Sequence, residues 1–211
     1  MIFQEPMTSL NPSMRCGKQV MENIRQHENV SRKEARNRTL ALFTEVMLPD
    51  PEKAFQAYPH QISGGQKQRI MIAMALACNP EILIADEPTT ALDVTVQKTI
   101  LSLLQSLQKK HNLSLIFISH NLDVIAEISD YVLVMHKGAI VEKGSVKQIF
   151  EHPEHPYTKG LLACRPPLGE RPLRLKVIAD FMNEGLEDSI QKSTHENRSK
   201  RHETMYAQPP V

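Results

Sequence analysis

Two short segments of the sequence combine residue types that suit nucleotide chemistry. Residues 62–69 read Ile-Ser-Gly-Gly-Gln-Lys-Gln-Arg, and the apolar run at residues 82–85 ends in the adjacent acids Asp86 and Glu87. A serine and two glycines at the start of a helix suit a phosphate, because unpaired backbone N–H groups and the helix dipole favour an anion there. Two acids at the end of a strand suit a magnesium ion and a water molecule.

Ser63 begins a segment whose pattern predicts a helix. The residues after the glycines are polar as far as Arg69 and then mostly apolar as far as Ala77, before the exit at Asn79-Pro80. A polar opening, a buried body and a proline exit are typical of a helix of about fourteen residues. An ordinary capped helix would begin with the same serine and glycines, so this segment alone does not distinguish a phosphate site from a cap.

The two acids follow a segment that predicts a buried strand. Residues 82–85 are few and wholly apolar, as expected of a central strand in a parallel sheet. Two acids at its end would repel each other and lose hydration unless a cation or solvent compensates. Ligands of open α/β sheets bind at the carboxyl ends of strands. A strand that simply reaches the surface at Asp86 is the alternative, and the continuation at residues 88–93 argues against it.

Several strings in a fixed order carry a resemblance to a known family. The sequence is similar to the nucleotide-binding domain of ABC transporters, in which a signature motif, a Walker B strand, a D-loop and an H-loop follow one another. The matching strings are Ile62-Ser63-Gly64-Gly65-Gln66, residues 82–87, Thr90-Ala91-Leu92-Asp93 and Ile116-Phe117-Ile118-Ser119-His120. Residues 3–12 resemble the Q-loop of the peptide and nickel importer subfamily, which residues 58–61 and 155–162 also resemble. The resemblance covers about residues 1–170.

The resemblance implies a fold and a reaction. The fold would be α/β, an incomplete P-loop NTPase core with a mostly parallel sheet, a helical subdomain and a C-terminal extension. The reaction would be ATP hydrolysis coupled to transport, with ATP and Mg²⁺ as cofactors. ATP would lie between two nucleotide-binding domains arranged head to tail, in a homo- or heterodimer. Transmembrane permease subunits would be the other partners.

The resemblance also assigns roles around the ATP that the domain would bind itself. Asp86 would hold Mg²⁺, and Glu87 would be the general base or would orient the attacking water. Gln4 would contact both the Mg²⁺ and that water, and His120 would hydrogen-bond the γ-phosphate. A helix-capping acid and a surface histidine are the ordinary alternatives for Glu87 and His120.

A second set of residues would act on a different ATP molecule. This set would contact the γ-phosphate of the ATP bound by the partner domain, and it comprises Ser63, Gly64, Gly65 and Gln66. Asp93 would lie at the seam of the dimer. The resemblance therefore assigns the two segments with nucleotide-like chemistry to two separate sites.

The sequence departs from the family in one major respect. The 211 residues contain no G-x-x-x-x-G-K-[S/T] loop, and the one Gly-Lys pair, Gly17-Lys18, is followed by Gln19. We therefore expect a fragment of a longer reading frame, or a start codon assigned too late. We expect no ATP turnover by this chain alone, because phosphoryl transfer depends on positioning and electrostatic stabilisation. The alternative function is a non-catalytic partner whose signature motif completes the site of another domain.

Composition argues against several other classes of protein. There are 25 basic and 24 acidic residues, whereas a nucleic-acid-binding domain shows a basic excess, so we expect no nucleic-acid partner. This balance and the importer-like strings also argue against an ABC protein of DNA repair or translation. No stretch reaches the roughly eighteen to twenty apolar residues that span a bilayer, and no signal peptide is evident. We expect a cytoplasmic protein, peripheral on the inner face of the cell membrane.

The remaining pattern predicts the elements that position these residues. We expect a partial ATPase domain over residues 1–150, with a helical subdomain at about 5–80, an extension over 151–182 and a disordered tail over 183–211. Helices are expected near 17–28, 31–47, 94–110 and 121–128, and Pro49 and Pro51 are expected to end the second helical region. The helix near 94–110 is expected to place Val96, Ile100, Leu103, Leu104 and Leu107 on one apolar face. A buried strand is expected over 113–118 and a hairpin around Lys137-Gly138. Ser31 and Glu34 have the spacing of a capping box. The prolines of residues 151–170 predict an irregular segment, and residues 171–182 resemble a linker between tandem domains. The separate cysteines Cys16, Cys78 and Cys164 predict free thiols and no iron–sulfur cluster.

Overall fold

A computed structural model describes residues 1–4, 9–90 and 92–164 of the chain. They belong to two compact units, one over residues 1–124 and one from residue 125 onward. The predicted linker at 171–182 and the predicted disordered tail at 183–211 lie outside the described residues. The same holds for residues 5–8 of the Q-loop-like string. The predicted domain boundary at residue 150 stays a prediction.

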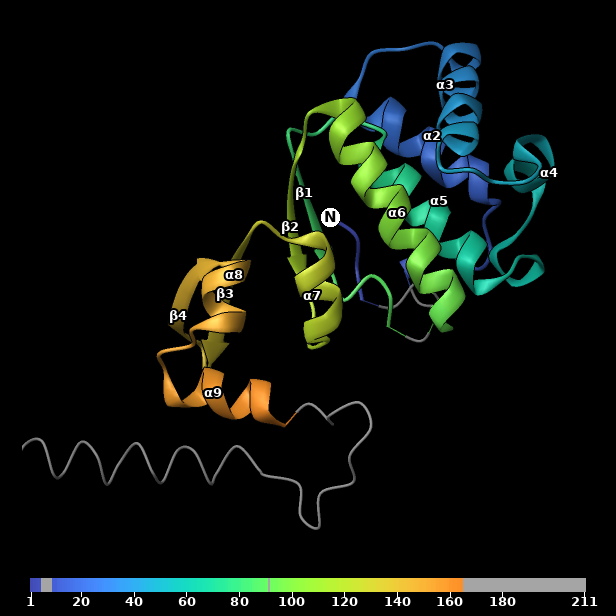
Figure 1. Ribbon diagram of the computed structural model, residues 1–211. Helices are drawn as coiled ribbons and strands as arrows, with labels where there is room; N and C mark the ends of the chain where they lie inside the picture. The colour runs from blue at the N-terminus through green and yellow to red at the C-terminus, as the bar shows by residue number, and fades with distance from the viewer. Residues whose placement is uncertain (5–8, 91, 165–211) are drawn as a thin grey trace, which may run out of the picture. The chain divides into compact units, whose positions relative to one another are not determined.

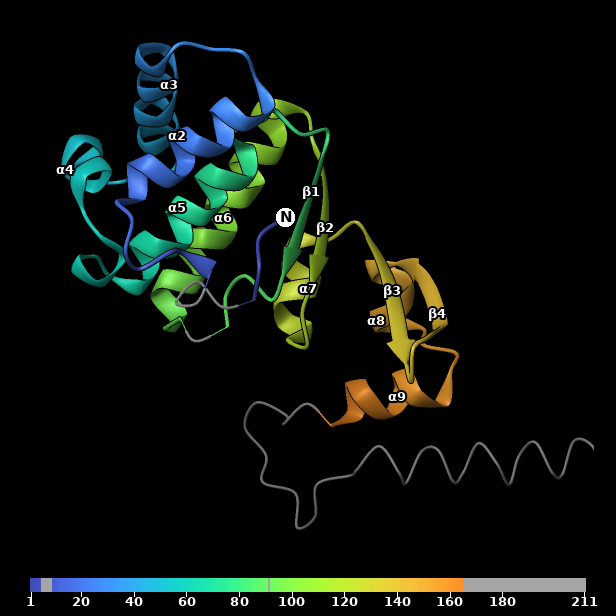
Figure 2. The ribbon, with the colours of Figure 1, turned by 180° about the vertical axis from the view of Figure 1, so that it is seen from behind.

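The first unit places its helices on one side of a small parallel sheet (Figures 1 and 2). Its elements are α2 (Cys16–His27), α3 (Arg32–Glu45), α4 (Pro51–Gln56), the 3-10 turn η1 (Pro59–Gln61), α5 (Gly64–Leu76), β1 (Ile82–Asp86), α6 (Val94–His111) and β2 (Ser114–Ile118). The predicted helices agree with α2, α3, α5 and α6 to within a few residues. Helix α4 was missed because Pro51 suggested an end. Pro51 instead occupies the first turn of α4, where a proline is tolerated, and Asp50 caps this helix by accepting from Lys53 N at 3.0 Å.

β1 lies between two parallel neighbours. It pairs with β2 from Ile82↔Ser114 to Asp86↔Ile118. On its other edge Ile2 forms an isolated parallel bridge, in which Ile2 N donates to Ile84 O at 2.7 Å and Asp86 N donates to Ile2 O at 3.0 Å. The parallel arrangement confirms the predicted α/β class. It also brings residues 2–4, which are distant in sequence, to the carboxyl end of β1.

One face of this sheet is buried and the opposite face is exposed in the part of the chain that the structure describes. Leu83 and Ala85 of β1 are 1% and 0% exposed, whereas Ile82, Ile116 and Ile118 are 58%, 50% and 46% exposed. Alternate side chains of a strand point to opposite faces, and the helices of this unit cover one face. The prediction of a wholly buried strand is therefore wrong for β2 and holds for every second residue of β1.

The covered face packs on a core that the helices share. α6 buries an apolar stripe of Ile100, Leu101, Leu103, Leu104 and Leu107. This stripe agrees with the predicted one, except that Leu101 was not predicted and the predicted Val96 is only half-buried. The other helices add apolar residues that are at most 5% exposed, among them Val20, Ile24, Phe43, Ile70, Met71 and Ile72. Burying each large apolar side chain stabilises the fold by roughly 1.5–3 kcal/mol. The helices of this unit therefore share one apolar core with the buried face of β1.

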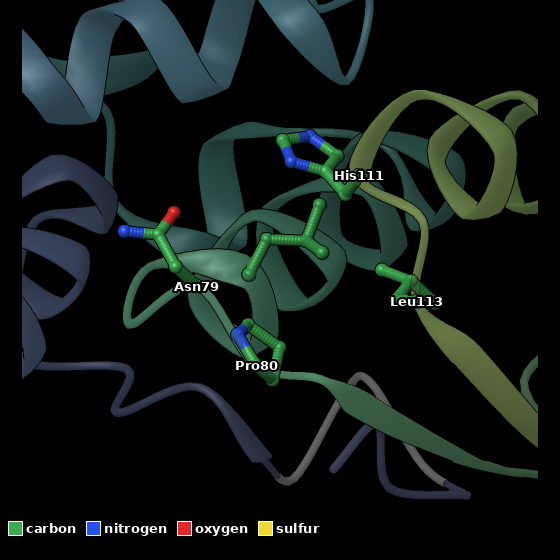
Figure 3. A pocket seen from close by; sticks show the side chains of 5 residues that line it. Asn79, Pro80, His111 and Leu113 are labelled. Carbon is green, nitrogen blue, oxygen red and sulfur yellow. The ribbon is translucent and has the colours of Figure 1, made fainter.

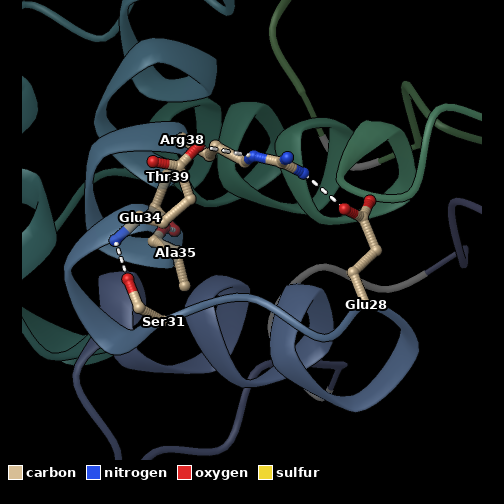
Figure 4. A network of polar contacts seen from close by, with 6 residues as sticks. All are labelled: Glu28, Ser31, Glu34, Ala35, Arg38 and Thr39. Atoms are coloured by element: carbon tan, nitrogen blue, oxygen red, sulfur yellow. Dashed lines mark hydrogen bonds and ion pairs between the residues drawn. The ribbon is translucent and has the colours of Figure 1, made fainter.

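Polar contacts around the start of α3 differ from the prediction. Ser31 Oγ accepts from Glu34 N at 3.1 Å, which is the serine half of a capping box (Figure 4). The Glu34 carboxylate does not complete the box and instead accepts from Arg38 Nε at 3.1 Å. Arg38 also bonds Glu28, at the end of α2. Arg38 thereby joins the turn between α2 and α3 to α3 itself.

The other end of α3 is tied to α5 and α6. Arg69 Nη1 of α5 donates to Val46 O at 2.6 Å, beyond the last turn of α3. The Glu45 carboxylate receives Lys110 Nζ at 2.7 Å and His111 Nε2 at 2.6 Å, both from the end of α6. Burial raises the pKa of Glu45, but the hydrogen bonds from Lys110 and His111 outweigh it and hold that pKa below its usual value. These contacts fix the directions of α5 and α6.

A small pocket lies near this contact. It is lined by Leu76, Asn79, Pro80, His111 and Leu113, at the ends of α5 and α6 (Figure 3). None of these residues is a predicted site residue. Asn79 has a positive φ of 46°, and Asn112 one of 49°, so both helices turn away from their axes beside this pocket. The pocket is therefore formed by two helix ends and is not part of the predicted site.

The second unit contains a hairpin followed by two helices. Its elements are β3 (Tyr131–His136), β4 (Ala139–Ser145), α8 (Val146–Glu151) and α9 (Pro156–Ala163), and α7 (Leu122–Ile128) crosses the boundary between the units. The predicted hairpin is confirmed, with Lys137 and Gly138 at φ 49° and 81° in its turn. The prediction of an irregular segment after residue 151 is wrong at α9, because Pro156 sits in the first turn of that helix rather than breaking it.

Two contacts hold α9 to the hairpin. The Glu142 carboxylate of β4 accepts from Glu154 N at 2.8 Å and from His155 N at 3.1 Å, at the start of α9. The Tyr157 ring stacks on His136 of β3 with a centroid distance of 4.1 Å. The importer-like string at residues 155–162 is therefore a helix docked on the hairpin.

Gly17 allows the close packing of α2 on α4. A Cβ atom at this position would lie 2.1 Å from Cδ2 of the Phe55 ring. Gly17→Ala must therefore displace the ring, and we expect it to lower the free energy of unfolding, measured in urea, by about 1–3 kcal/mol. In a Phe55→Ala background the same substitution should cost far less. An equal loss in both backgrounds would contradict this packing.

Candidate functional site

The carboxylate of Glu87 is the centre of a cluster of polar side chains. Gln4 Nε2 donates to Glu87 Oε2 at 2.9 Å, and Thr90 Oγ1 donates to the same oxygen at 2.9 Å. His120 Nδ1 lies 2.8 Å from Glu87 Oε1. The sheet explains this convergence, because Gln4 follows the Ile2 bridge, Glu87 follows β1 and His120 follows β2. The structure thus gathers three of the predicted site residues, Gln4, Glu87 and His120.

The backbone at Glu87 is strained. Its φ of 44° lies in the left-handed region, which costs a residue other than glycine about 1–3 kcal/mol. Two backbone hydrogen bonds hold this conformation: Glu87 N donates to Ile118 O at 2.9 Å, and Thr90 N donates to Glu87 O at 3.1 Å. The turn directs the Glu87 side chain towards Gln4 and His120. Such outliers cluster at functional sites, so this one supports a role for Glu87.

The hydrogen bonds of the cluster also set the charge of Glu87. Bonds from His120, Thr90 and Gln4 outweigh burial and hold the pKa of Glu87 below its usual value. The carboxylate is therefore ionised at neutral pH and can only accept, so the His120 nitrogen facing it, Nδ1, carries the proton. The Glu87 side chain is 19% exposed and that of His120 is 74% exposed. His120 is thus a surface residue that is held by a specific bond.

Asp86 places a second carboxylate at the same edge of the sheet. It ends β1, it is half-buried, and its N–H donates to Ile2 O at 3.0 Å. Gln4 turns its amide nitrogen to Glu87, which leaves its carbonyl oxygen for another partner. Within the described residues no cluster of three or more His, Cys, Asp or Glu side chains could cage a metal. Mg²⁺ commonly binds one or two carboxylates together with substrate phosphates, so Asp86 and the Gln4 oxygen fit Mg²⁺ of this kind.

The second group of predicted residues lies at the start of α5. Ser63 Oγ accepts from Gln66 N at 3.3 Å, and Gln66 Oε1 accepts from Ser63 N at 3.1 Å. This is a full capping box, which the sequence analysis missed although Gln66 stands three residues after Ser63. The N–H groups of Gly64 and Gly65 have no acceptor within a helix that begins there. They are the amides that α5 can offer to an anion.

The starts of α5 and α6 pack against each other. A Cβ atom on Gly65 would lie 3.0 Å from Val96 Cγ1, so a larger residue would require Val96 to move by a few tenths of an ångström. Asp93 lies beside this contact and caps α6 by accepting from Val96 N at 2.9 Å. The structure therefore places Asp93 next to the signature-like segment. Among the described residues, no hydrogen bond joins this second group to the Glu87 cluster.

Thr90 is the member of the cluster that the sequence analysis did not assign. Its hydroxyl is bound to Glu87 Oε2, and its own N–H is bound to Glu87 O. The signal was the hydroxyl three residues after Glu87, a spacing at which a turn brings side chains together.

Comparison with known proteins agrees with this geometry. Residues 1–90 match the protein family described as "ABC transporter", and residues 141–201 match the family described as "Oligopeptide/dipeptide transporter, C-terminal region". The Glutathione import ATP-binding protein GsiA of Escherichia coli K12 is 56% identical over 169 residues, which are 80% of this chain and 27% of that protein. The corresponding protein of Pectobacterium atrosepticum is 55% identical over the same length. The chain spans about a quarter of the length of these relatives, 27%.

Solved structures show the same fold. The ATP-binding cassette MJ0796, in a dimeric post-hydrolysis state bound to ADP and Pi, has a TM-score of 0.60 and 28% identity, over 69% of this chain and 61% of the other. The protein cbiO1 from Clostridium perfringens, part of the ABC transporter complex cbiONQ, has a TM-score of 0.63 and 29% identity, over 72% and 58% of the two chains.

The parallel sheet, the Glu87 cluster and the capped start of α5 define an ABC transporter ATP-binding domain with the P-loop NTPase fold. Within that class, the chain belongs to the proteins that carry the oligopeptide/dipeptide transporter C-terminal region. No helix among residues 1–4, 9–90 and 92–164 combines the length and the apolar character needed to cross a membrane.

Asp93 stabilises α6 as its cap, and this role can be tested separately from its predicted place at the seam of the dimer. Asp93→Ala removes the acceptor for Val96 N, and we expect the free energy of unfolding in urea to fall by about 1 kcal/mol. Asp93→Ser keeps a capping oxygen and should stay within about 0.5 kcal/mol of the native chain. Equal losses in the two variants would show that the cap is not what Asp93 contributes to stability.

Proposed function

We propose that this chain is part of the ATP-binding subunit of a peptide importer, in which ATP hydrolysis energises transport through transmembrane permease subunits. The observation that carries the proposal is the Glu87 carboxylate held by Gln4 and His120 at the carboxyl edge of a parallel sheet. The C-terminal region and the glutathione-importing relatives support a peptide cargo over nickel, the other cargo of the subfamily. The subunit would be cytoplasmic and peripheral on the inner face of the membrane.

In this proposal the Glu87 cluster acts on the attacking water. Glu87 orients the water and accepts its proton, and its fixed orientation matters because phosphoryl transfer depends mainly on positioning and electrostatics. Asp86 and the carbonyl oxygen of Gln4 would hold Mg²⁺, which would neutralise charge on the phosphates. His120 donates to Glu87 through Nδ1. It can donate to a phosphate through Nε2 only as an imidazolium or after it has left Glu87.

The start of α5 acts, in the same proposal, on the nucleotide of a second nucleotide-binding domain. Gly64 and Gly65 offer backbone amides, and the helix dipole favours a phosphate there. Gln66 N is occupied by Ser63 Oγ in the capping box. The Ser63 hydroxyl can keep accepting from Gln66 N while it donates its own proton to a phosphate, because a hydroxyl both accepts and donates.

A second candidate function is a non-catalytic partner domain. The start of α5 is fully formed and closely packed on α6, whereas the 211 residues contain no P-loop sequence. Such a chain would complete the ATP site of a P-loop-bearing domain and hydrolyse nothing itself. For either function we expect no ATP turnover by the purified 211-residue chain alone.

The proposal predicts ATP-dependent association with a P-loop-bearing nucleotide-binding domain. In analytical ultracentrifugation, a mixture with Mg²⁺ and ATP should sediment as a heterodimer, and the same mixture without nucleotide should not. Ser63→Arg should abolish the association, because a long side chain would fill the space of the phosphate. Ser102→Arg, at an exposed position of α6, is the matched control and should associate normally. Association that occurs without ATP, or that persists in Ser63→Arg, would contradict the proposal.

Two assays separate the two candidate functions. In a longer ATP-binding subunit that supplies a P-loop to the Glu87 site, a catalytic Glu87 predicts that Glu87→Gln lowers phosphate release about tenfold or more, since general bases contribute factors of about 10²–10⁴. In the mixture of the 211-residue chain with a P-loop-bearing domain, a non-catalytic partner role predicts that Glu87→Gln leaves phosphate release unchanged while Ser63→Arg abolishes it.

A further inference from the structure

The two oxygens of the Glu87 carboxylate are not equivalent. Oε2 receives two donors, Gln4 Nε2 and Thr90 Oγ1, each at 2.9 Å. Oε1 receives one, His120 Nδ1 at 2.8 Å. An ionised carboxylate has about two acceptor positions on each oxygen. In the part of the chain that the structure describes, Oε2 is therefore saturated and Oε1 keeps one open position.

Thr90 is held where its hydroxyl must meet Oε2. Its N–H donates to Glu87 O at 3.1 Å, which closes the turn that begins at Glu87. The Glu87 backbone is itself fixed by its bond to Ile118 O and by its left-handed φ of 44°. Gln4, by contrast, is exposed and reaches Glu87 with a long side chain from another segment. Thr90 is thus the donor with the least freedom to leave.

We propose that Thr90 is a positioning residue that fixes which oxygen of Glu87 reacts. By occupying Oε2 together with Gln4, it holds the carboxylate so that Oε1 presents the open acceptor position. Oε1 is then the oxygen that binds the attacking water and takes its proton. This last step rests on the proposed function, whereas the orientation of the carboxylate does not.

An ordinary turn role for Thr90 makes a different prediction. Threonine hydroxyls often stabilise turns by local hydrogen bonds. If that were the whole role, loss of the hydroxyl would lower stability and leave the Glu87–His120 bond unchanged. The orientation of the carboxylate must therefore be measured apart from stability.

The protonation of the His120 ring reports that orientation in the full 211-residue chain. Because Glu87 Oε1 accepts from Nδ1, ¹⁵N imidazole NMR at neutral to mildly basic pH should show His120 as the Nδ1–H tautomer, with its signals identified by their loss in His120→Gln. Thr90→Val removes the donor and keeps the shape of the side chain. It should let the carboxylate rotate and shift His120 towards the Nε2–H tautomer. Thr90→Ser should restore the native spectrum.

The matched control is Thr99→Val, which removes an exposed α6 hydroxyl bonded to Thr95 O at 2.8 Å. It should leave the His120 spectrum native. A native tautomer in Thr90→Val would overturn the positioning role, whatever the change in its stability.

The ATPase arm tests the consequence for catalysis. In a longer ATP-binding subunit that supplies a P-loop to the Glu87 site, Thr90→Val should lower kcat about tenfold or more and leave KM for ATP within about twofold, because it misdirects a catalytic group without touching the nucleotide. Thr90→Ser should recover most of kcat. An unchanged kcat in Thr90→Val would overturn the assignment of Oε1. If the native subunit shows no turnover, the proposed function fails, and the NMR experiment still decides the role of Thr90.

Discussion

The left-handed turn at Glu87 is the constraint on which the rest of the site depends. β1 ends between Ile2 and β2, and the chain must turn sharply there for Glu87 N to reach Ile118 O at 2.9 Å. The turn directs the carboxylate to the edge where Gln4 and His120 also emerge. A regular continuation of the strand would send the Glu87 side chain to a different face. The backbone strain at Glu87 is thus offset by hydrogen bonds that gather residues from distant parts of the sequence.

The helices of the first unit hold the second group of predicted residues in place, as the turn at Glu87 does for the first group. Glu45 and Arg69 connect α3 to α6 and α5 respectively. The small contact between Gly65 and Val96 then brings the capped starts of α5 and α6 together. The chain therefore holds two preformed groups, one centred on a carboxylate and one on helix amides. Their separation within the chain agrees with the idea that they serve two different nucleotides.

The sequence predicted those parts of the structure that local chemistry decides. The apolar stripe of α6, the N-cap at Ser63 and the Lys137-Gly138 turn follow from spacing and turn chemistry, and the strings around Glu87 and His120 indicated the family. Long-range geometry was not predictable in this way. The exposure of Ile116 depends on which face the helices cover, and the role of Thr90 depends on the positive φ of Glu87. Pro51 and Pro156 misled the prediction because a proline both ends helices and begins them.

The most direct test of the account compares two substitutions at Glu87 by urea unfolding. Alanine keeps the strain of the left-handed backbone and glycine relieves it, so Glu87→Gly should be more stable than Glu87→Ala by about 1 kcal/mol. At Glu22, an exposed helical position of α2, the order should be the reverse, with alanine more stable by about 1 kcal/mol. A Glu87→Ala variant as stable as Glu87→Gly, or more stable, would contradict the turn on which the site depends.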